Sequence, residues 1–330
     1  MPLKGFTSWR SASSNSAQSH ERKISPWRIL RHSALDWILA GAMYGVFNYL
    51  GGGGRQGFRR RFDINDTSIQ FPFAEKERVT TTQLYLISLA APAVIILVVS
   101  VIARTRSFAD TNAGLLSLAL AFSMTNSVTN IIKVLVGRPR PDMLDRCKPI
   151  AGAVNAAIVG LSTSDICTQT DMKRLNEGFR SFPSGHSSLS ATGMTVLALF
   201  LAAKLTLYPS IGSGVKAWLC VVPLVSAALV AVSRTMDYRH HATDVLSGAF
   251  LGIIIGYASY RRYYPRPTDR LAALSYLPGE DPHDRWVGER EVREVRQSDE
   301  RFGLTRDIRT EEGRSQSGHE LSSLSMGPKQ

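Results

Sequence analysis

The sequence predicts an all-α fold, a polytopic membrane bundle of six transmembrane helices. Six apolar stretches lie between the polar ends of the 330-residue chain. A helix needs about 20 residues to cross the hydrocarbon core, and each stretch is close to that length. The alternative is a soluble helical bundle that buries the same stretches in its core. The stretch Leu84–Ala103 contains no charged residue, which favours the membrane fold.

The predicted spans are, in chain order, Ala34–Leu50, Leu84–Ala103, Ala113–Val136, Leu189–Leu207, Ala217–Val232 and Val245–Tyr260. The first follows a polar, basic stretch without an apolar core, so we expect an uncleaved anchor and not a signal peptide. Pro92 is compatible with the second span, because neighbouring helices can satisfy the carbonyl group that a proline leaves free. The fifth and sixth hold 16 residues each and need flanking residues to cross a membrane.

Three regions are expected: a polar, basic N-terminal tail (1–33), the six-span domain (34–260) and a disordered C-terminal tail (261–330). The C-terminal tail carries 13 basic and 13 acidic side chains, so the formal net charge of +12 comes from the rest of the chain. A basic chain often binds nucleic acid, but this one contains no recognition helix, zinc pattern or stacking motif. Anionic lipid headgroups explain the charge better, so we expect a membrane and no nucleic acid as partner.

Three short polar strings lie at the ends of predicted spans. They are Lys133-Val-Leu-Val-Gly-Arg-Pro-Arg140, Pro183-Ser-Gly-His186, and Ser233-Arg234 followed by His240 and Asp244. The first string ends the third span, the second precedes the fourth, and the third joins the fifth to the sixth. Because successive spans cross in opposite directions, all three strings are expected on one face of the membrane.

The orientation of that face follows from weaker signals. The basic N-terminus and the arginines within 261–270 favour cytosolic termini under the positive-inside rule, whereas four arginines in the first linker (55, 59, 60 and 61) oppose it. Two further features favour cytosolic termini. The glycosylation sequon Asn65-Asp-Thr67 lies in the first linker. Cys147 and Cys167 share the 137–182 linker, where a lumenal location would permit a disulfide, although they could also be two free thiols. Cys220 is expected to pack inside a span.

The residue types in the strings suit a bound phosphoryl group. The planar fork of arginine donates two parallel hydrogen bonds to phosphate oxygens, which makes Arg140 and Arg234 candidate ligands. Lys133 would add a point charge, although it could instead extend to the membrane interface. Arg138 is an alternative to Arg140.

Ser184 and Gly185 precede a predicted helix, whose N-terminal amides favour an anion. Gly185 would let backbone approach the phosphate closely, and the Ser184 hydroxyl would donate to it. His186 would then protonate a leaving alkoxide as general acid. In isolation this string could equally be a capping serine followed by an interfacial histidine.

His240 and Asp244 are four residues apart and would share a helical face if the sixth span begins near them. A carboxylate bonded to one ring nitrogen makes the other nitrogen a better nucleophile. His241 is the alternative nucleophile. Asp244 is the only acidic residue of the three strings, so no metal and no cofactor are expected.

The order and spacing of the strings resemble the type 2 phosphatidic acid phosphatase superfamily. Three wider strings resemble its fungal-type diacylglycerol pyrophosphate and phosphatidate phosphatases: RFDINDTSIQFPF (61–73), RPRPDMLDRCKP (138–149) and EGFRSFPSGHSS (177–188). The resemblance favours His240 over His241 as nucleophile. It departs at Ala242, where lipid phosphatases commonly have an aromatic residue.

The resemblance implies a membrane lipid phosphate phosphatase that needs no magnesium and forms a phosphohistidine intermediate. Its substrate would be phosphatidate, diacylglycerol pyrophosphate or both. It also implies a lumenal or extracellular site, in the plasma membrane or an endomembrane such as vacuole, Golgi or endoplasmic reticulum. A sphingoid-phosphate phosphatase and a catalytically silent lipid-phosphate scaffold are alternatives, and the oligomeric state stays open. A transporter is less compatible, because its polar groups would lie near the middle of the membrane.

Overall fold

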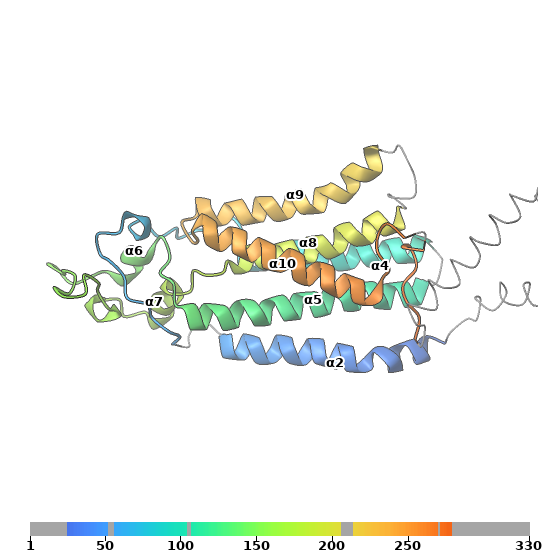
Figure 1. Cartoon of the computed structure of the whole chain (residues 1–330), viewed down its shortest axis with the longest axis horizontal. Coiled ribbons are helices and arrows are strands. Elements are labelled where there is room, and N and C mark those ends of the chain that lie inside the picture. Colours follow the sequence, from blue (N-terminus) through green and yellow to red (C-terminus); the bar gives the residue numbers. More distant parts are fainter. Residues whose placement is uncertain (1–24, 52–55, 104–106, 206–213, 270, 279–330) are drawn as a thin grey trace, which may run out of the picture. The chain divides into compact units, whose positions relative to one another are not determined.

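The computed structural model describes residues 25–51, 56–103, 107–205, 214–269 and 271–278. The chain divides into two units, residues 1–278 and 279–330, and the second lies outside the described residues. Within the described ranges, all regular elements are helices, accompanied by two isolated β-bridges (Figure 1). The predicted all-α class is therefore confirmed. Residues 1–24 of the predicted N-terminal tail and residues 279–330 of the predicted C-terminal tail lie outside the described residues.

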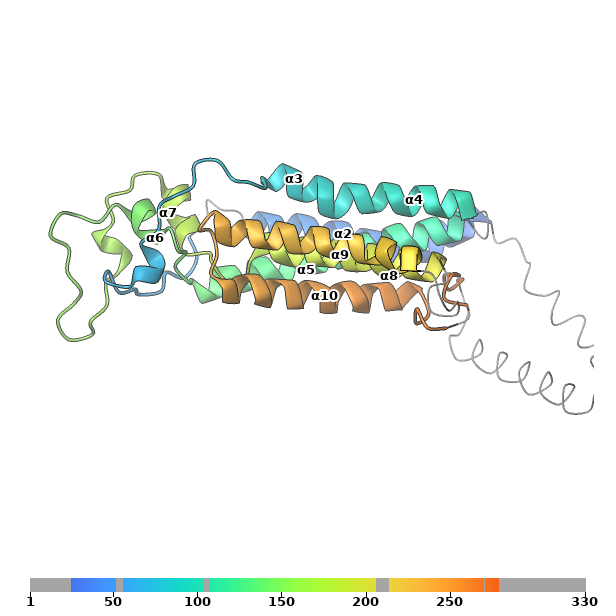
Figure 2. The ribbon, with the colours of Figure 1, turned by 90° about the horizontal axis from the view of Figure 1, so that it is seen from above.

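The long helices run alongside one another (Figures 1 and 2). They are α2 (Pro26–Gly51), α4 (Ala91–Ala103), α5 (Ser107–Val136), α8 (Gly185–Lys204), α9 (Gly214–Met236) and α10 (Ala242–Tyr263). The short helix α3 (Thr81–Tyr85) continues into α4 through the π-helical turn η3 (Leu86–Ala90). This turn precedes Pro92, which cannot donate a backbone hydrogen bond to the preceding turn.

Five of these segments are long and apolar enough to cross a membrane: Thr81–Ile102, Phe108–Val136, Gly185–Lys204, Gly214–Met236 and Ala242–Tyr263. The predicted fifth and sixth spans gain enough length from flanking residues. The predicted first span, Ala34–Leu50, lies inside α2, which is not among the five. The six-span count is thus not confirmed. Polar groups lower the hydropathy of α2, but two of them have partners on other helices: Asp36 accepts from the Tyr263 hydroxyl (2.7 Å), and Asn48 accepts from Asn126 (3.1 Å).

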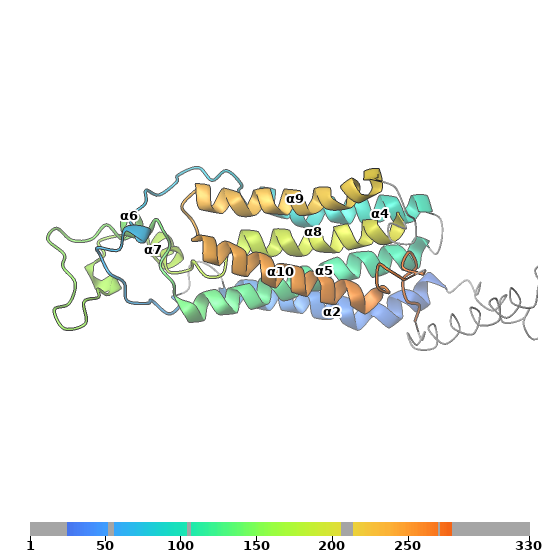
Figure 3. The ribbon, with the colours of Figure 1, turned by 45° about the horizontal axis from the view of Figure 1, so that its top comes forward.

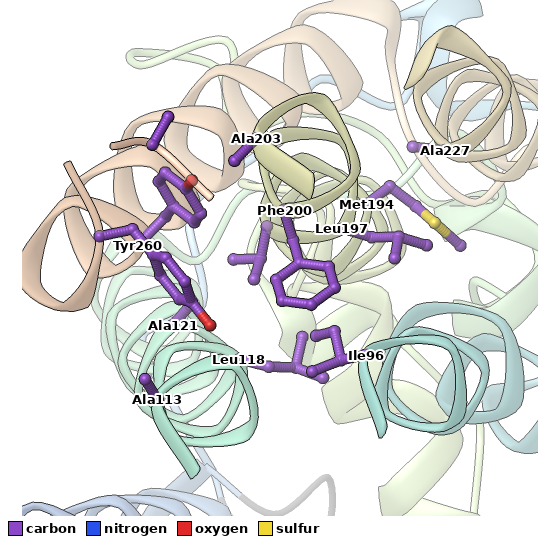
Figure 4. Close-up of a cluster of buried hydrophobic side chains, with 13 residues drawn as sticks. Ile96, Ala113, Leu118, Ala121, Met194, Leu197, Phe200, Ala203, Ala227 and Tyr260 are labelled. Atoms are coloured by element: carbon purple, nitrogen blue, oxygen red, sulfur yellow. The ribbon is translucent and has the colours of Figure 1, made fainter. Parts of the chain in front are cut away.

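Helix α8 is the central helix of the bundle (Figure 3). In its apolar window 83% of residues are buried, against 22% for Thr81–Ile102. Phe200 of α8 packs in a cluster with Ile96, Leu118 and Tyr260, which come from three other helices (Figure 4). Small residues bring the backbones together. A Cβ atom on Gly193 would lie 1.8 Å from the Ser88 carbonyl oxygen.

A loop-rich cap covers the end of the bundle at which α5 and α9 end and α8 and α10 begin (Figure 2). It contains α6 (Met143–Cys147), α7 (Met172–Gly178) and the 3-10 turns η2 (Thr67–Ile69) and η4 (Ser164–Ile166). Cys147 and Cys167 form a disulfide within it, which decides between the two alternatives for these cysteines. Cys220 is a buried free cysteine, in agreement with the prediction.

At the opposite end, the described chain continues past the predicted tail boundary at residue 260. Lys204 of α8 forms a buried ion pair with Asp110 of α5 (2.8 Å), and Asp110 also accepts from the backbone amide of Ser275 (2.9 Å). The Ser275 contact holds residues 271–278 against the bundle. The sequence does not predict these contacts, because the stretch lacks a periodic apolar pattern.

Candidate active site

The three polar strings meet at the capped end of the bundle. Lys133 lies in the last turn of α5, and Arg234 lies in the last turn of α9. Ser184 caps the start of α8, and Asp244 lies in the first turn of α10. The antiparallel order of the helices therefore brings together residues more than 100 positions apart (Figure 1).

Lys133 and Arg140 converge on one carbonyl group. Lys133 Nζ donates to the carbonyl oxygen of Arg180 (2.8 Å), and Arg140 Nη2 lies 3.5 Å from the same oxygen. Lys133 therefore has a backbone partner within the bundle end. Arg138, the alternative to Arg140, instead donates to Asp244 Oδ1 (2.6 Å).

Glu177, which no motif singled out, pairs with Arg140 at 3.0 Å. Burial raises the pKa of this carboxyl, but the positive charges of Arg140, Lys133 and Arg180 together lower it by more than burial raises it. The pKa is therefore below its ordinary value. The Glu177 carboxylate is therefore ionised at neutral pH and balances part of the positive charge.

The second string forms the N-terminus of α8. The Ser184 hydroxyl accepts from the Ser187 hydroxyl (2.9 Å) and from the Ser187 amide (3.4 Å), so it serves as the N-cap. Gly185 lies beside Lys133, with the position of an added Cβ 3.7 Å from Lys133 Cε. His186 Nε2 is 3.1 Å from the carbonyl oxygen of Val79, on the segment before α3.

The third string departs from its expected geometry. His240 Nδ1 lies 2.7 Å from the Ser181 carbonyl oxygen but 4.0 Å from Asp244 Oδ2. The expected direct hydrogen bond between His240 and Asp244 is therefore not formed. The reason is that α10 begins at Ala242, so His240 precedes the helix and shares no helical face with Asp244.

Asp244 instead connects several groups around His240. It accepts from the Ser181 hydroxyl (2.5 Å), from the His241 amide (3.0 Å) and from Arg138. His241 Nδ1 is 3.2 Å from the same carboxylate, within a capping box that starts α10. Asp244 thus reaches His240 through Ser181, a residue that sequence analysis did not single out although it lies in the 177–188 string.

Burial lowers the pKa of His240 well below its ordinary value of 6.5, and the positive charges of Lys133 and Arg140 lower it further. The imidazole is therefore neutral at pH 7. Because a carbonyl oxygen can only accept, Nδ1 carries the hydrogen, and Nε2 keeps its lone pair. A neutral imidazole with a free Nε2 lone pair can act as a nucleophile.

Arg234 is fully buried and has acidic partners. Its Nη1 donates to Glu77 (2.8 Å), its Nη2 to Asp237 (2.8 Å) and its Nε to the Ser233 hydroxyl (3.2 Å). Glu77 comes from the segment before α3, where no motif had indicated a functional residue. Across the described ranges, no group of three or more histidine, cysteine, aspartate or glutamate side chains could hold a metal ion.

Comparisons with known proteins agree on one family. The model of the PAP2 superfamily matches residues 114–267. "Diacylglycerol pyrophosphate phosphatase 1" of Saccharomyces cerevisiae is 40% identical over 219 residues, which cover 66% of this chain and 75% of the yeast protein. "Probable diacylglycerol pyrophosphate phosphatase 1" of Schizosaccharomyces pombe is 34% identical over 223 residues, 68% of this chain and 78% of that protein. "Probable lipid phosphate phosphatase 4" of Arabidopsis thaliana is 31% identical over 255 residues, 76% of this chain and 79% of that protein. No solved structure matches the chain.

Proposed function

Since the chain belongs to the PAP2 superfamily and is a lipid phosphate phosphatase homologue, we propose that it dephosphorylates phosphatidate, diacylglycerol pyrophosphate or both. Phosphatidate would give diacylglycerol and phosphate, and diacylglycerol pyrophosphate would give phosphatidate and phosphate. The observation that carries the proposal is the neutral, buried His240 beside the charges of Lys133 and Arg140.

In the first step, the Nε2 lone pair of His240 attacks phosphorus and forms a phosphorus–nitrogen bond while the bond to the leaving oxygen breaks. Lys133, Arg140 and Arg234 neutralise the charge on the non-bridging oxygens. His186, protonated once the bound phosphate offsets the positive charges of Arg234, Lys133 and Arg140, gives its proton to the leaving oxygen. The Ser181 carbonyl supports this step, because it stabilises the positive charge that develops on His240.

In the second step, water attacks the phosphohistidine. His186, now neutral, takes a proton from that water, and the phosphorus–nitrogen bond breaks to release phosphate and regenerate neutral His240. Asp244 acts as a positioning residue, since it binds the Ser181 hydroxyl and Arg138 and not His240 itself. Ser184 and Gly185 would supply the N-terminus of α8 to the phosphate. No metal or cofactor takes part in either step.

We also propose that α2 crosses the membrane in addition to the five apolar segments. The total of six spans would put both termini on one side. The 26 residues of α2 correspond to about 39 Å at 1.5 Å per residue, enough to cross a bilayer. It packs against α5, and its polar groups have partners on neighbouring helices. The Cys147–Cys167 disulfide supports an oxidising compartment for the active site, lumenal or extracellular, with cytosolic termini.

The test is phosphate release by the purified protein from vesicles that contain one lipid phosphate at a time. The panel comprises phosphatidate, lysophosphatidate, diacylglycerol pyrophosphate and a sphingoid phosphate. Release from phosphatidate or diacylglycerol pyrophosphate, abolished by His240→Ala, supports the proposal. Binding without release from any lipid would favour a silent scaffold, and a preference for the sphingoid phosphate would redefine the substrate.

A further inference from the structure

A glutamate from the segment before α3 contacts the arginine that we assign to phosphate binding. Glu77 Oε2 accepts from Arg234 Nη1 at 2.8 Å, and Glu77 Oε1 lies 3.3 Å from Arg239 Nη2. Asp237 and Ser233 bind the other two nitrogen atoms of Arg234. Glu77 therefore holds the guanidinium nitrogen that a phosphoryl oxygen would need.

The position of Glu77 in the chain distinguishes it from the other glutamate of the site. Glu177 also contacts a candidate phosphate ligand, Arg140, but it lies in α7 and pairs with Arg180 as well. Glu77 lies in a segment without helical structure, residues 73–79, and its side chain is 29% exposed. It can leave Arg234 without unwinding a helix.

The segment 73–79 also contacts other parts of the site. The Val79 carbonyl oxygen is 3.1 Å from His186 Nε2, and the Ala74 carbonyl accepts from Arg239 Nη2 at 2.9 Å. The Arg78 amide donates to Asp237, which also binds Arg234. A displacement of Glu77 would therefore loosen a segment that touches the general acid candidate.

A carboxylate and a phosphoryl group compete for the same guanidinium, because both are anionic acceptors. A phosphate monoester carries more charge and more acceptor oxygens than one carboxylate. We propose that Glu77 occupies the phosphoryl-binding position of Arg234 in the free protein, and that the phosphate of the substrate displaces it. This inference rests on the proposed function. Glu77 thereby weakens the binding of substrate and of product phosphate and speeds release of the product.

The first test compares Glu77→Gln with Glu75→Gln in the full-length protein. Glu75 is the matched control, since it lies on the same segment, its side chain is 75% exposed and its ion pair is with Arg174. Glu77→Gln should lower both the inhibition constant of inorganic phosphate and the KM about three- to tenfold, the range for losing a partly exposed competing ion pair. Glu75→Gln should change neither. An unchanged or higher inhibition constant in Glu77→Gln would overturn the inference.

The second test uses the unaltered protein, so it does not depend on folding of a variant. Hydrogen exchange of peptides covering 73–79 is measured with and without saturating inorganic phosphate. Exchange should increase with phosphate, because the displaced segment no longer holds the Arg78 amide against Asp237. Unchanged or decreased exchange would contradict the displacement.

The variant Arg234→Gln separates this inference from the proposed function. If Arg234→Gln loses phosphate affinity while Glu77→Gln matches the unaltered protein, only the displacement by substrate is wrong. If Arg234→Gln keeps its phosphate affinity and its activity, the assignment of the phosphate site itself fails.

Discussion

The Nδ1 atom of His240 lies 2.7 Å from the carbonyl oxygen of Ser181, and the hydroxyl of the same serine donates to Asp244. Ser181 therefore lies between His240 and Asp244, the two residues that the sequence spacing had paired directly. A backbone carbonyl fixes the tautomer of His240 and leaves Nε2 without a hydrogen. Asp244 keeps Ser181 and Arg138 in place.

Substitution of His240 and of His186 should reduce activity in different ways when the leaving group of the substrate changes. His240→Ala should abolish turnover of every substrate, because no group remains to take up the phosphoryl moiety. His186→Ala should lose about 10²- to 10⁴-fold on a lipid phosphate but much less on p-nitrophenyl phosphate, whose leaving group scarcely needs a proton. Steady-state rates on both substrates measure this difference.

Rapid quench in alkali, in which phosphohistidine is stable, should trap a phosphoenzyme in the His186 variant and none in His240→Ala. If His240→Ala stays active while His241→Ala is dead, the nucleophile is the adjacent residue. If neither substitution matters, the phosphohistidine mechanism is wrong.

The depressed pKa of His240 should make stability depend on pH. Below the ordinary histidine pKa of 6.5, the unfolded chain binds a proton that the folded protein does not bind. The stability contributed by this site is therefore present above pH 6.5 and falls as the pH decreases below it. Relative to His240→Gln, the free energy of unfolding should drop by up to about 1.4 kcal/mol per pH unit. Denaturant unfolding in detergent between pH 7.5 and 5.5 measures the difference, and parallel curves would contradict it.

Activity should persist in excess EDTA. In the proposed mechanism, the positive charges of Lys133, Arg140 and Arg234 neutralise the phosphoryl group, as a divalent metal ion would otherwise do. Phosphate release from phosphatidate vesicles is the measurement, with and without added magnesium. Complete loss that magnesium restores would rule out the proposed chemistry.

Tags at residues 1 and 330 should both be accessible from the cytosol, because the six spans that we propose would return the chain to the side on which it started. Protease protection of sealed membrane vesicles detects each tag. Attachment of a glycan at Asn65, removed by Asn65→Gln, would independently place the capped end in the lumen. Tags on opposite sides of the membrane would mean that α2 does not cross.

The disulfide should stabilise the cap over the active site. Cys147 and Cys167 are separated by 20 positions, and closing a loop of that size contributes about 3 kcal/mol in the chain-entropy model. The double variant Cys147→Ser/Cys167→Ser should unfold at lower temperature, whereas Cys220→Ser lacks this effect because Cys220 is free. Equal melting temperatures of the double variant and the unaltered protein would show that the bridge contributes nothing.

The sequence by itself determined the helical class, the positions of the apolar segments and the meeting of the three strings at one end. These follow from local properties: uninterrupted apolar length defines a membrane helix, and alternating direction decides which ends meet. The length of the fifth and sixth spans and the contacts of residues beyond 260 were less well predicted, because flanking polar residues join the fold when a neighbour satisfies them. Lys204 and Asp110 illustrate this, since both are buried and form an ion pair with each other.

Only the tertiary structure decided which partners the functional groups have. The interval between His240 and Asp244 would place them together on a helix, but α10 starts after His240, and the carboxylate binds His241 and Ser181 instead. Glu77 reaches Arg234 across 157 positions of sequence, and no local pattern encodes such a contact. Hydrogen bonds and ion pairs depend on distances between segments, which folding sets and which spacing along the chain does not.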